Sequence, residues 1–221
     1  DCINDETLAL LKAYGVTRIC VNPQTFNDKT LVEIGRKHTA KDIFDKYALA
    51  KKYGFDINMD LIAGLPGESL NDFKYSVDAA AELSPENVTV HTLSLKKGSV
   101  LKEKVERLAP GEIKNMIDYS AYKLINNGFS PYYMYRQKYM AGNQENVGYA
   151  LPGHACQYNV DIMEETTHIL ALGAGGISKR VYPEEGHIGR APNVSNIEQY
   201  IARVEEMIGR KKALFLPEMP L

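Results

Sequence analysis

The sequence has no tryptophan and only three cysteines among its 221 residues. Cys2, Cys20 and Cys156 lie far apart, so they form none of the short Cys-x-x-Cys patterns that hold zinc or an iron–sulfur cluster. Their odd number argues against a disulfide framework and favours a reducing compartment, so we expect a cytoplasmic protein. Histidines are scarce as well. No His, Cys or Glu stands at metal-ligand spacing from His91, His154, His168 or His187, and we expect no metal site made by this chain alone.

Long apolar runs and an excess of one charge are also missing. No apolar run reaches the roughly 18 residues that a membrane-spanning helix needs, and no segment has the pattern of a signal peptide. The 26 Lys and Arg residues nearly balance the 28 Asp and Glu residues, which leaves a net charge of -2. This balance gives no electrostatic reason for binding nucleic acid or a membrane surface, so we expect neither as a partner.

The first half of the chain repeats a unit made of a helix, a glycine and a strand. One helical pattern ends at Gly15 and precedes an apolar run over 17–21, and a second ends at Gly54 and precedes 55–62. A third helix is expected over 70–83, followed by a strand over 87–93. Glycine at a helix end lets the backbone turn left-handed before the strand. Strands alternating with helices of this length predict an α/β fold with a parallel sheet.

The second half, from residue 109 on, has a different pattern. We expect a helix over 110–127 that ends at Gly128, an aromatic strand over 129–135, and a loop with a short helix possible over 137–155. A further strand over 166–172 and a last helix from about Ser195 to Gly209 complete the pattern. Ser195 and Glu198 fit a capping box at the start of that helix. Its expected buried residues are Ile197, Tyr200, Ile201, Val204 and Ile208.

Polar residues stand where the three expected strands of the first half end. Asn22 and Gln24 follow the first strand, Asp60 lies within the second, and His91 and Ser94 lie at the end of the third. Reactive groups of parallel β/α folds cluster at these carboxyl ends.

Two charged residues admit both a structural and a functional interpretation. Asp60 is a carboxylate inside an apolar strand, so it either accepts hydrogen bonds from structural neighbours or is presented to a ligand hydroxyl or amine. Arg36 is either a solvated surface residue or a bidentate clamp for a ligand carboxylate.

The stretch 173–176 is rich in glycine but does not fit Gly-x-Gly-x-x-Gly, so it is weak evidence for a phosphate loop. It suits a backbone that closely approaches a flat ligand.

Several of these segments together resemble a known family. Residues 18–31 with 35–39 resemble the fourth-strand region of radical S-adenosylmethionine (SAM) proteins of the coproporphyrinogen dehydrogenase type, 58–67 the fifth strand, and 88–94 the sixth. Residues 169–178 are similar to a motif of the same family's C-terminal domain. Within the family, 132–143 and 175–181 are most similar to the HemZ type.

The resemblance implies a fold and a set of binding residues. Residues 1–108 would form the C-terminal half of a partial (β/α)6 TIM-like radical SAM barrel, with three βα units, and 109–221 a smaller α+β C-terminal domain. Gln24, Arg36 and Asp60 would bind SAM, with Arg36 on its carboxylate. Ser94 would touch SAM through its backbone, and Ile177 would lie at a second SAM or substrate site. No catalytic residue is assigned.

The resemblance also implies cofactors and partners. They are SAM, a [4Fe-4S] cluster, a porphyrinogen or haem ligand, and an electron donor protein of the flavodoxin or ferredoxin type. The family's cluster motif would precede Asp1, so we expect this chain to be a fragment that is inactive alone. The expected reaction of the intact protein is oxidative decarboxylation of coproporphyrinogen III to protoporphyrinogen IX, in anaerobic haem biosynthesis.

Three alternatives remain open at this stage. The first is a haem-binding protein of the same family that transfers haem, with His154, Cys156 or His187 as the axial ligand. The second is another porphyrin-modifying radical SAM reaction. The third is half of an unrelated sugar-phosphate barrel, which the lack of a glycine-rich phosphate loop at a helix N-terminus disfavours.

Overall fold

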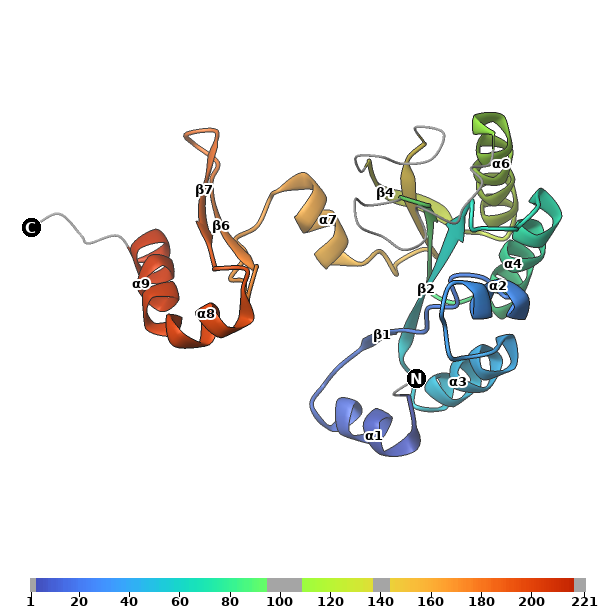
Figure 1. The fold of residues 1–221 in the computed structure, drawn as a ribbon, viewed down its shortest axis with the longest axis horizontal. Coiled ribbons are helices and arrows are strands. Elements are labelled where there is room, and N and C mark those ends of the chain that lie inside the picture. The colour runs from blue at the N-terminus through green and yellow to red at the C-terminus, as the bar shows by residue number, and fades with distance from the viewer. Residues whose placement is uncertain (1–2, 95–108, 137–143, 217–221) are drawn as a thin grey trace, which may run out of the picture. The chain divides into compact units, whose positions relative to one another are not determined.

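The computed structural model describes residues 3–94, 109–136 and 144–216. The chain divides into two compact units, Asp1–Cys156 and Gln157–Leu221 (Figure 1). The elements of the first unit are α1 (Asp5–Ala13), β1 (Arg18–Cys20), α2 (Asp28–Glu33), α3 (Ala40–Lys52), β2 (Asp56–Ala63), α4 (Leu70–Leu83), β3 (Asn87–Thr92), α6 (Pro110–Asn126), β4 (Ser130–Tyr135) and β5 (Asn146–Ala150).

The strands of the first unit form one mixed sheet in the order β1-β2-β3-β5-β4. β1, β2 and β3 run parallel, and β5 is antiparallel to both of its neighbours. The repeated helix–glycine–strand pattern is therefore confirmed, and so is the α/β fold class with a parallel-containing sheet. The partial barrel is consistent with this sheet, since three parallel strands with their helices are part of such a barrel.

Local sequence signals explain where the helices begin and end. Thr39 and Ser69 are N-caps, and each forms a capping box with the aspartate three residues later, Asp42 and Asp72. The glycines that were expected to end helices have positive φ angles, +74° at Gly15, +67° at Gly54 and +87° at Gly128. Glycine adopts this left-handed conformation without the steric cost of a Cβ atom.

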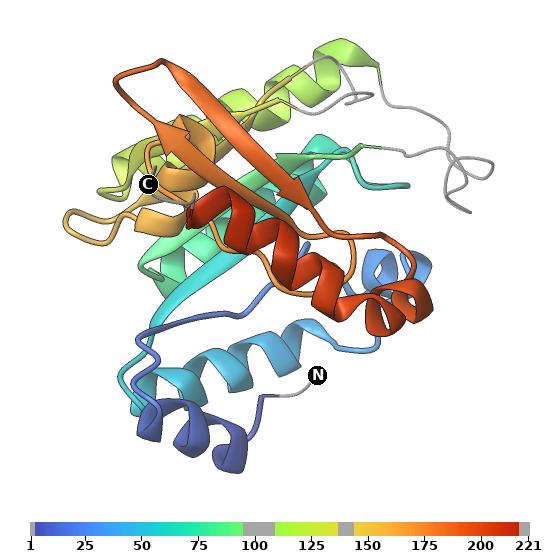
Figure 2. The same cartoon turned by 90° about the vertical axis from the view of Figure 1, so that its left-hand side faces the viewer.

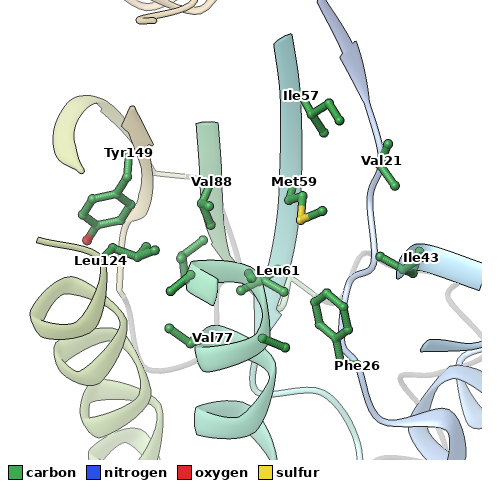
Figure 3. Close-up of a cluster of buried hydrophobic side chains, with 14 of the residues drawn as sticks. Val21, Phe26, Ile43, Ile57, Met59, Leu61, Val77, Val88, Leu124 and Tyr149 are labelled. Carbon is green, nitrogen blue, oxygen red and sulfur yellow. The ribbon is translucent and has the colours of Figure 1, made fainter. Parts of the chain in front are cut away.

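Burial alternates along β2, and this alternation separates two faces of the sheet. Ile57, Met59 and Leu61 are buried, while the intervening Asn58 and Asp60 are only half-buried. The apolar face packs against helices, and α3, α4 and α6 lie on the same side of the sheet in Figure 1. Figure 3 shows the core that results, with side chains of three strands meeting Val77 of α4 and Leu124 of α6.

The first unit extends beyond residue 108, where the barrel part was expected to end. α6, β4 and β5 follow that position, and both strands join the same sheet as β1–β3. The expectation of a loop over 137–155 was wrong for 146–150, because β5 forms there and pairs with β3. β5 is short and contains a glycine, so its pattern is weak, and its backbone hydrogen bonds come from a distant strand. The role of 109–221 as a family-specific domain stays a prediction.

The second unit contains α7 (Gln157–Glu164), β6 (Ile177–Tyr182), β7 (His187–Pro192), α8 (Ile197–Ala202) and α9 (Val204–Phe215). β6 and β7 form an antiparallel hairpin, and α9 lies along it in Figure 2. Arg180 of β6 donates to the Leu214 carbonyl at 2.8 Å, and Arg210 of α9 donates to the Pro192 carbonyl at 3.0 Å.

Three expectations for the second unit were wrong. Residues 166–172 form no strand and make only an isolated bridge between Ile169 and Lys179, because the hairpin partner of β6 is β7. The last helix begins one residue late, with Asn196 as its N-cap, and breaks at Arg203. Its expected buried face is largely exposed, with 68% of Ile197 and of Ile201 accessible, whereas Met207 is fully buried.

No helix within residues 3–94, 109–136 and 144–216 is both long and apolar enough to cross a membrane.

We expect Leu61→Ala to lower the free energy of unfolding by about 2–5 kcal/mol, because it leaves a cavity between the sheet and α4. Leu61 is fully buried in β2, whereas 76% of Val32 on α2 is exposed. Val32→Ala should therefore change the free energy by no more than about 0.5 kcal/mol. Urea unfolding followed by circular dichroism measures both variants. Equal midpoints for the two would contradict the assignment of Leu61 to the core.

Candidate functional site

The carboxyl ends of the parallel strands bring three of the predicted polar residues together. In the sheet register Asp60 of β2 is opposite Thr89, and Ile62 is opposite His91, on β3. Asn22 follows β1 and reaches across to β2. All of these positions except Ile62 carry polar side chains, so this end of the sheet presents donors and acceptors where ligands of parallel β/α folds bind.

The Asp60 carboxylate is held by two asparagine amides. Asn22 Nδ2 donates to Asp60 Oδ2 at 2.7 Å, and Asn58 Nδ2 donates to Oδ1 at 2.8 Å. His91 Nε2 lies 3.6 Å from the same Oδ1 atom. The side chain remains 23% exposed. Structural hydrogen bonds therefore satisfy much of the carboxylate, as the structural interpretation expected, and they also fix its orientation while one side stays accessible.

A pair of stacked tyrosines from β4 borders this group. The rings of Tyr133 and Tyr135 are 6.2 Å apart and nearly parallel, with an interplanar angle of 6°. Tyr133 lies over Gly148 of β5, where an added Cβ would stand 1.8 Å from its ring, so a glycine is required there. The ring thereby reaches across β5 to Thr89, at a distance of 3.3 Å between the two hydroxyl oxygens. Burial raises the pKa of both tyrosines, so their hydroxyls stay neutral hydrogen-bonding groups.

A pocket of about 780 Å³ opens beside β1 and contains Arg36. Its lining includes Cys20 and Asn22 from the end of β1, and Lys46 from α3. Arg36 is exposed, and its guanidinium forms no ion pair with a described carboxylate. Pockets of this size accommodate small ligands and cofactors. The cationic lining favours a ligand with a carboxylate or phosphate group.

The remaining predicted site residues lie in different places. Gln24 is 8% exposed and has a φ of 66°, which is unusual for a residue with a side chain. Its backbone bridges to β2, donating to the Asp60 carbonyl and accepting from Ile62 N, both at 2.9 Å. Ser94 is half-buried just after β3. Ile177 is the first residue of β6, in the second unit. The structure thus groups Gln24 and Asp60 and places Arg36 in the adjoining pocket; their ligand-binding roles stay predictions.

Sequence reasoning missed Asn58, Tyr133 and Tyr135 as parts of this group. Asn58 could have been found, because it stands two residues before Asp60 and alternate strand residues share one face. The tyrosines could not be assigned in this way. They reach the site only because β5 inserts between β3 and β4, and no short-range pattern encodes that pairing.

A buried carboxyl supports the loop that follows Gln24. Glu68 is 1% exposed, and Thr25 Oγ1 donates to its Oε1 atom at 2.5 Å. The Thr25 hydroxyl also lies 3.0 Å from Ser76 Oγ, which accepts a hydrogen bond from the backbone N–H of Phe26. Burial raises the pKa of Glu68, and the hydrogen bond from Thr25 offsets this rise only in part. The other oxygen, Oε2, has no hydrogen-bond partner among the described residues.

The described residues offer little for metal binding. Within them, no group of three or more His, Cys, Asp or Glu side chains is placed to hold a metal ion. Of the three haem-ligand candidates, Cys156 is half-buried and has a free thiol. His154 Nδ1 pairs with Asp56 Oδ2 at 3.1 Å, and His187 Nδ1 pairs with Glu185 Oε2 at 3.1 Å.

Comparison with known proteins gives a consistent set of relatives. Residues 1–80 match the family model of the radical SAM superfamily. The oxygen-independent coproporphyrinogen-III oxidase-like protein HemZ of Bacillus subtilis (strain 168) is 40% identical over 96% of this chain and 43% of its own length. The heme chaperone HemW of Lactococcus lactis is 28% identical over 97% of this chain and 56% of its own length.

One solved structure shares the fold over most of the chain. Coproporphyrinogen III oxidase (HemN) from Escherichia coli, described as a radical SAM enzyme, matches with a TM-score of 0.70 at 22% identity. The match covers 93% of this chain and 47% of that chain. The chain spans about half the length of the curated relatives it matches.

We expect the stability difference between Glu68→Gln and the unchanged protein to depend on pH. Because the pKa of Glu68 in the folded state lies above its ordinary value of 4.5, the folded protein binds more protons than the unfolded chain in the interval between the two values. The stability of the unchanged protein therefore falls as pH rises from about 4.5 through the raised pKa, and the loss is complete above it. The glutamine side chain of the variant does not titrate, so the variant should gain relative stability over this interval.

Urea unfolding at a series of pH values measures this difference. Glu82→Gln is the matched control, because Glu82 is exposed on α4 and its replacement should give a nearly constant difference. Parallel stability curves for Glu68→Gln and the unchanged protein would show that burial does not raise the pKa of Glu68.

Proposed function

We propose that this chain, whose residues 1–80 match the radical SAM superfamily model, forms the SAM-binding part of an oxidoreductase that oxidatively decarboxylates coproporphyrinogen III to protoporphyrinogen IX. The observation that carries the proposal is the Asp60 carboxylate, oriented by Asn22 and Asn58 at the strand ends, beside a pocket that contains Arg36. The substrate class is supported by the name of the HemZ relative, which aligns with 96% of the chain.

The polar groups of SAM correspond to the side chains at this end of the sheet. SAM carries a carboxylate, an ammonium group and ribose hydroxyls. Arg36 would pair with the carboxylate, since its guanidinium has no described carboxylate partner and lines the pocket. Asp60 and Gln24 would accept from or donate to the other polar groups. Ser94 would contribute backbone contacts at the end of β3, and Ile177 would line a second SAM or substrate site.

The chain's own residues would orient SAM and exclude water, while the cofactors supply the redox chemistry. Conversion of a propionate to a vinyl group with loss of CO₂ is a two-electron oxidation. SAM and a [4Fe-4S] cluster would supply the hydrogen-atom abstraction that removes the first electron, and an electron acceptor would take the second. Cys2, Cys20 and Cys156 form no short cluster-binding pattern, so we assign no cluster ligand to this chain. A flavodoxin or ferredoxin type of protein would supply the electrons.

Haem binding is a second candidate function, and one contact favours it. His154 Nδ1 pairs with Asp56, and Asp56 also accepts from Arg18 Nη2 at 3.1 Å. A carboxylate on one ring nitrogen orients a histidine so that its other nitrogen, Nε2, can bind a metal. His154 is 40% exposed, so a haem iron could reach it. The HemW relative is named a heme chaperone.

We expect Arg36→Ala and Asp60→Asn to weaken SAM binding without unfolding the protein. Loss of a charge-assisted hydrogen bond costs about 1.5–3 kcal/mol, which is roughly a ten- to hundredfold rise in Kd. Isothermal titration of SAM into the full-length natural protein, with its cluster reconstituted anaerobically, measures the change. Lys29→Ala is the control, because Lys29 is exposed on α2 and does not line the pocket. Normal affinity in both test variants would refute the site assignment.

Product analysis separates the two candidate functions. The same protein is supplied with SAM, a reductant and coproporphyrinogen III, and mass spectrometry follows 5′-deoxyadenosine and the loss of two carboxyl groups. Both products together are the expected result. A haem absorption band that His154→Ala abolishes, with unchanged coproporphyrinogen, would instead establish haem binding.

A further inference from the structure

A line of three side chains crosses the open face of the sheet from β4 to β2. The Tyr135 hydroxyl of β4 lies 3.1 Å from His91 Nδ1 of β3, and His91 Nε2 lies 3.6 Å from Asp60 Oδ1 of β2. β5 separates β3 from β4, so the Tyr135 side chain reaches over a whole strand to make this contact. His91 is 25% exposed and Asp60 is 23% exposed, so the line borders solvent where a ligand would bind.

We propose that Tyr135 and His91 are a positioning pair for the Asp60 carboxylate, and that they set how tightly the site holds SAM. The inference rests on the proposed function, because it takes SAM as the ligand of Asp60. It adds two residues, from β3 and β4, to a site that the parallel strands alone would define.

The arrangement of atoms keeps an N–H of His91 directed at Asp60. A carboxylate only accepts hydrogen bonds, so the proton of a neutral imidazole is favoured on Nε2, and Nδ1 is left as an acceptor. The Tyr135 hydroxyl can donate to Nδ1 in that state and can accept from Nδ1–H when the ring is protonated. Tyr135 therefore adapts to either state, and Nε2–H points toward Asp60 in both.

His91 completes a set of donors around one carboxylate. Asn22, just after β1, donates to Oδ2, and Asn58 of β2 donates to Oδ1. His91 approaches from β3 and, at 3.6 Å, is close enough for electrostatic attraction but too far for a full hydrogen bond. The imidazole thus limits rotation of the carboxylate and leaves Oδ1 able to accept from a ligand. Small displacements of such a group cause large losses of binding or rate.

The contact of Tyr135 with His91 also has a structural explanation, in which it only fastens β4 to the sheet. The two explanations differ in what the replacements do together. If Tyr135 acts through His91, removing its hydroxyl has no effect once the imidazole is gone. If it only fastens the sheet, each replacement lowers stability, and SAM affinity stays unchanged.

The experiment is a double-mutant cycle on SAM affinity, measured by isothermal titration with the full-length natural protein after anaerobic cluster reconstitution. Tyr135→Phe should raise the Kd about three- to tenfold, the loss expected for one hydrogen bond. His91→Leu should raise it by at least as much, and the double variant by no more than His91→Leu alone. His91→Gln should recover much of the affinity, because its amide restores a donor facing Asp60.

Tyr149→Phe is the matched control on the same sheet. Tyr149 is buried on the opposite face and points toward α6 beside Leu124 (Figure 3), so its replacement should lower stability and leave SAM affinity unchanged. If Tyr135→Phe does not fold, the comparison of His91→Leu with His91→Gln still decides the role of the imidazole.

The possible failures are distinguishable. No SAM binding by the unchanged protein overturns the proposed function and the inference with it. Weak binding by Asp60→Asn together with normal binding by Tyr135→Phe and His91→Leu overturns the inference alone. Additive losses in the double variant also overturn it, because they show that Tyr135 does not act through His91.

Discussion

The alternation of side chains along β2 is the constraint on which the first unit depends. Ile57, Met59 and Leu61 point into the core beneath the helices, and Asn58 and Asp60 point to the opposite, open face. A shift of pairing by one residue would bury the carboxylate and expose the apolar side chains, so the register with β1 and β3 is strongly determined. The same register places Asp60 beside Asn22 and His91. Stability and the candidate site therefore come from one geometric feature.

A glycine on β5 and a buried carboxyl beneath the loop after β1 help to fix the conformation around the site. Gly148 has no side chain, and this lets the Tyr133 ring cross β5 and approach Thr89. Beneath the loop after β1, the buried Glu68 carboxyl holds Thr25, the residue that follows the strained Gln24. A buried carboxyl costs free energy unless it is neutral or well bonded, so this network trades stability for a defined loop conformation. A loop held by buried hydrogen bonds has little freedom to move, so it can keep a binding residue in one orientation.

Similarity to known proteins describes long segments of the chain, whereas the geometry of the candidate site describes single side chains. The match to the radical SAM family model concerns residues 1–80, and the fold shared with HemN covers 93% of the chain. The arrangement around Asp60 and the pocket with Arg36 concern individual atoms. A relative named a coproporphyrinogen-III oxidase-like protein and one named a heme chaperone both align over nearly the whole chain. A common scaffold therefore does not decide between the two proposed functions.

The sequence by itself determined the elements whose signals are local. The parallel βα units, the glycines at helix ends and the polar strand ends all follow from local spacing, and motif resemblance indicated the family whose model matches residues 1–80. Only the tertiary structure decided which strands pair when they are far apart in the sequence, and which side chains meet as a result. It inserted β5 between β3 and β4, replaced the strand expected over 166–172 with the β6–β7 hairpin, and brought Tyr135 to His91. The physical reason is that strand pairing supplies hydrogen bonds from any part of the chain, so whether a short segment such as β5 is a strand depends on the distant strands it pairs with.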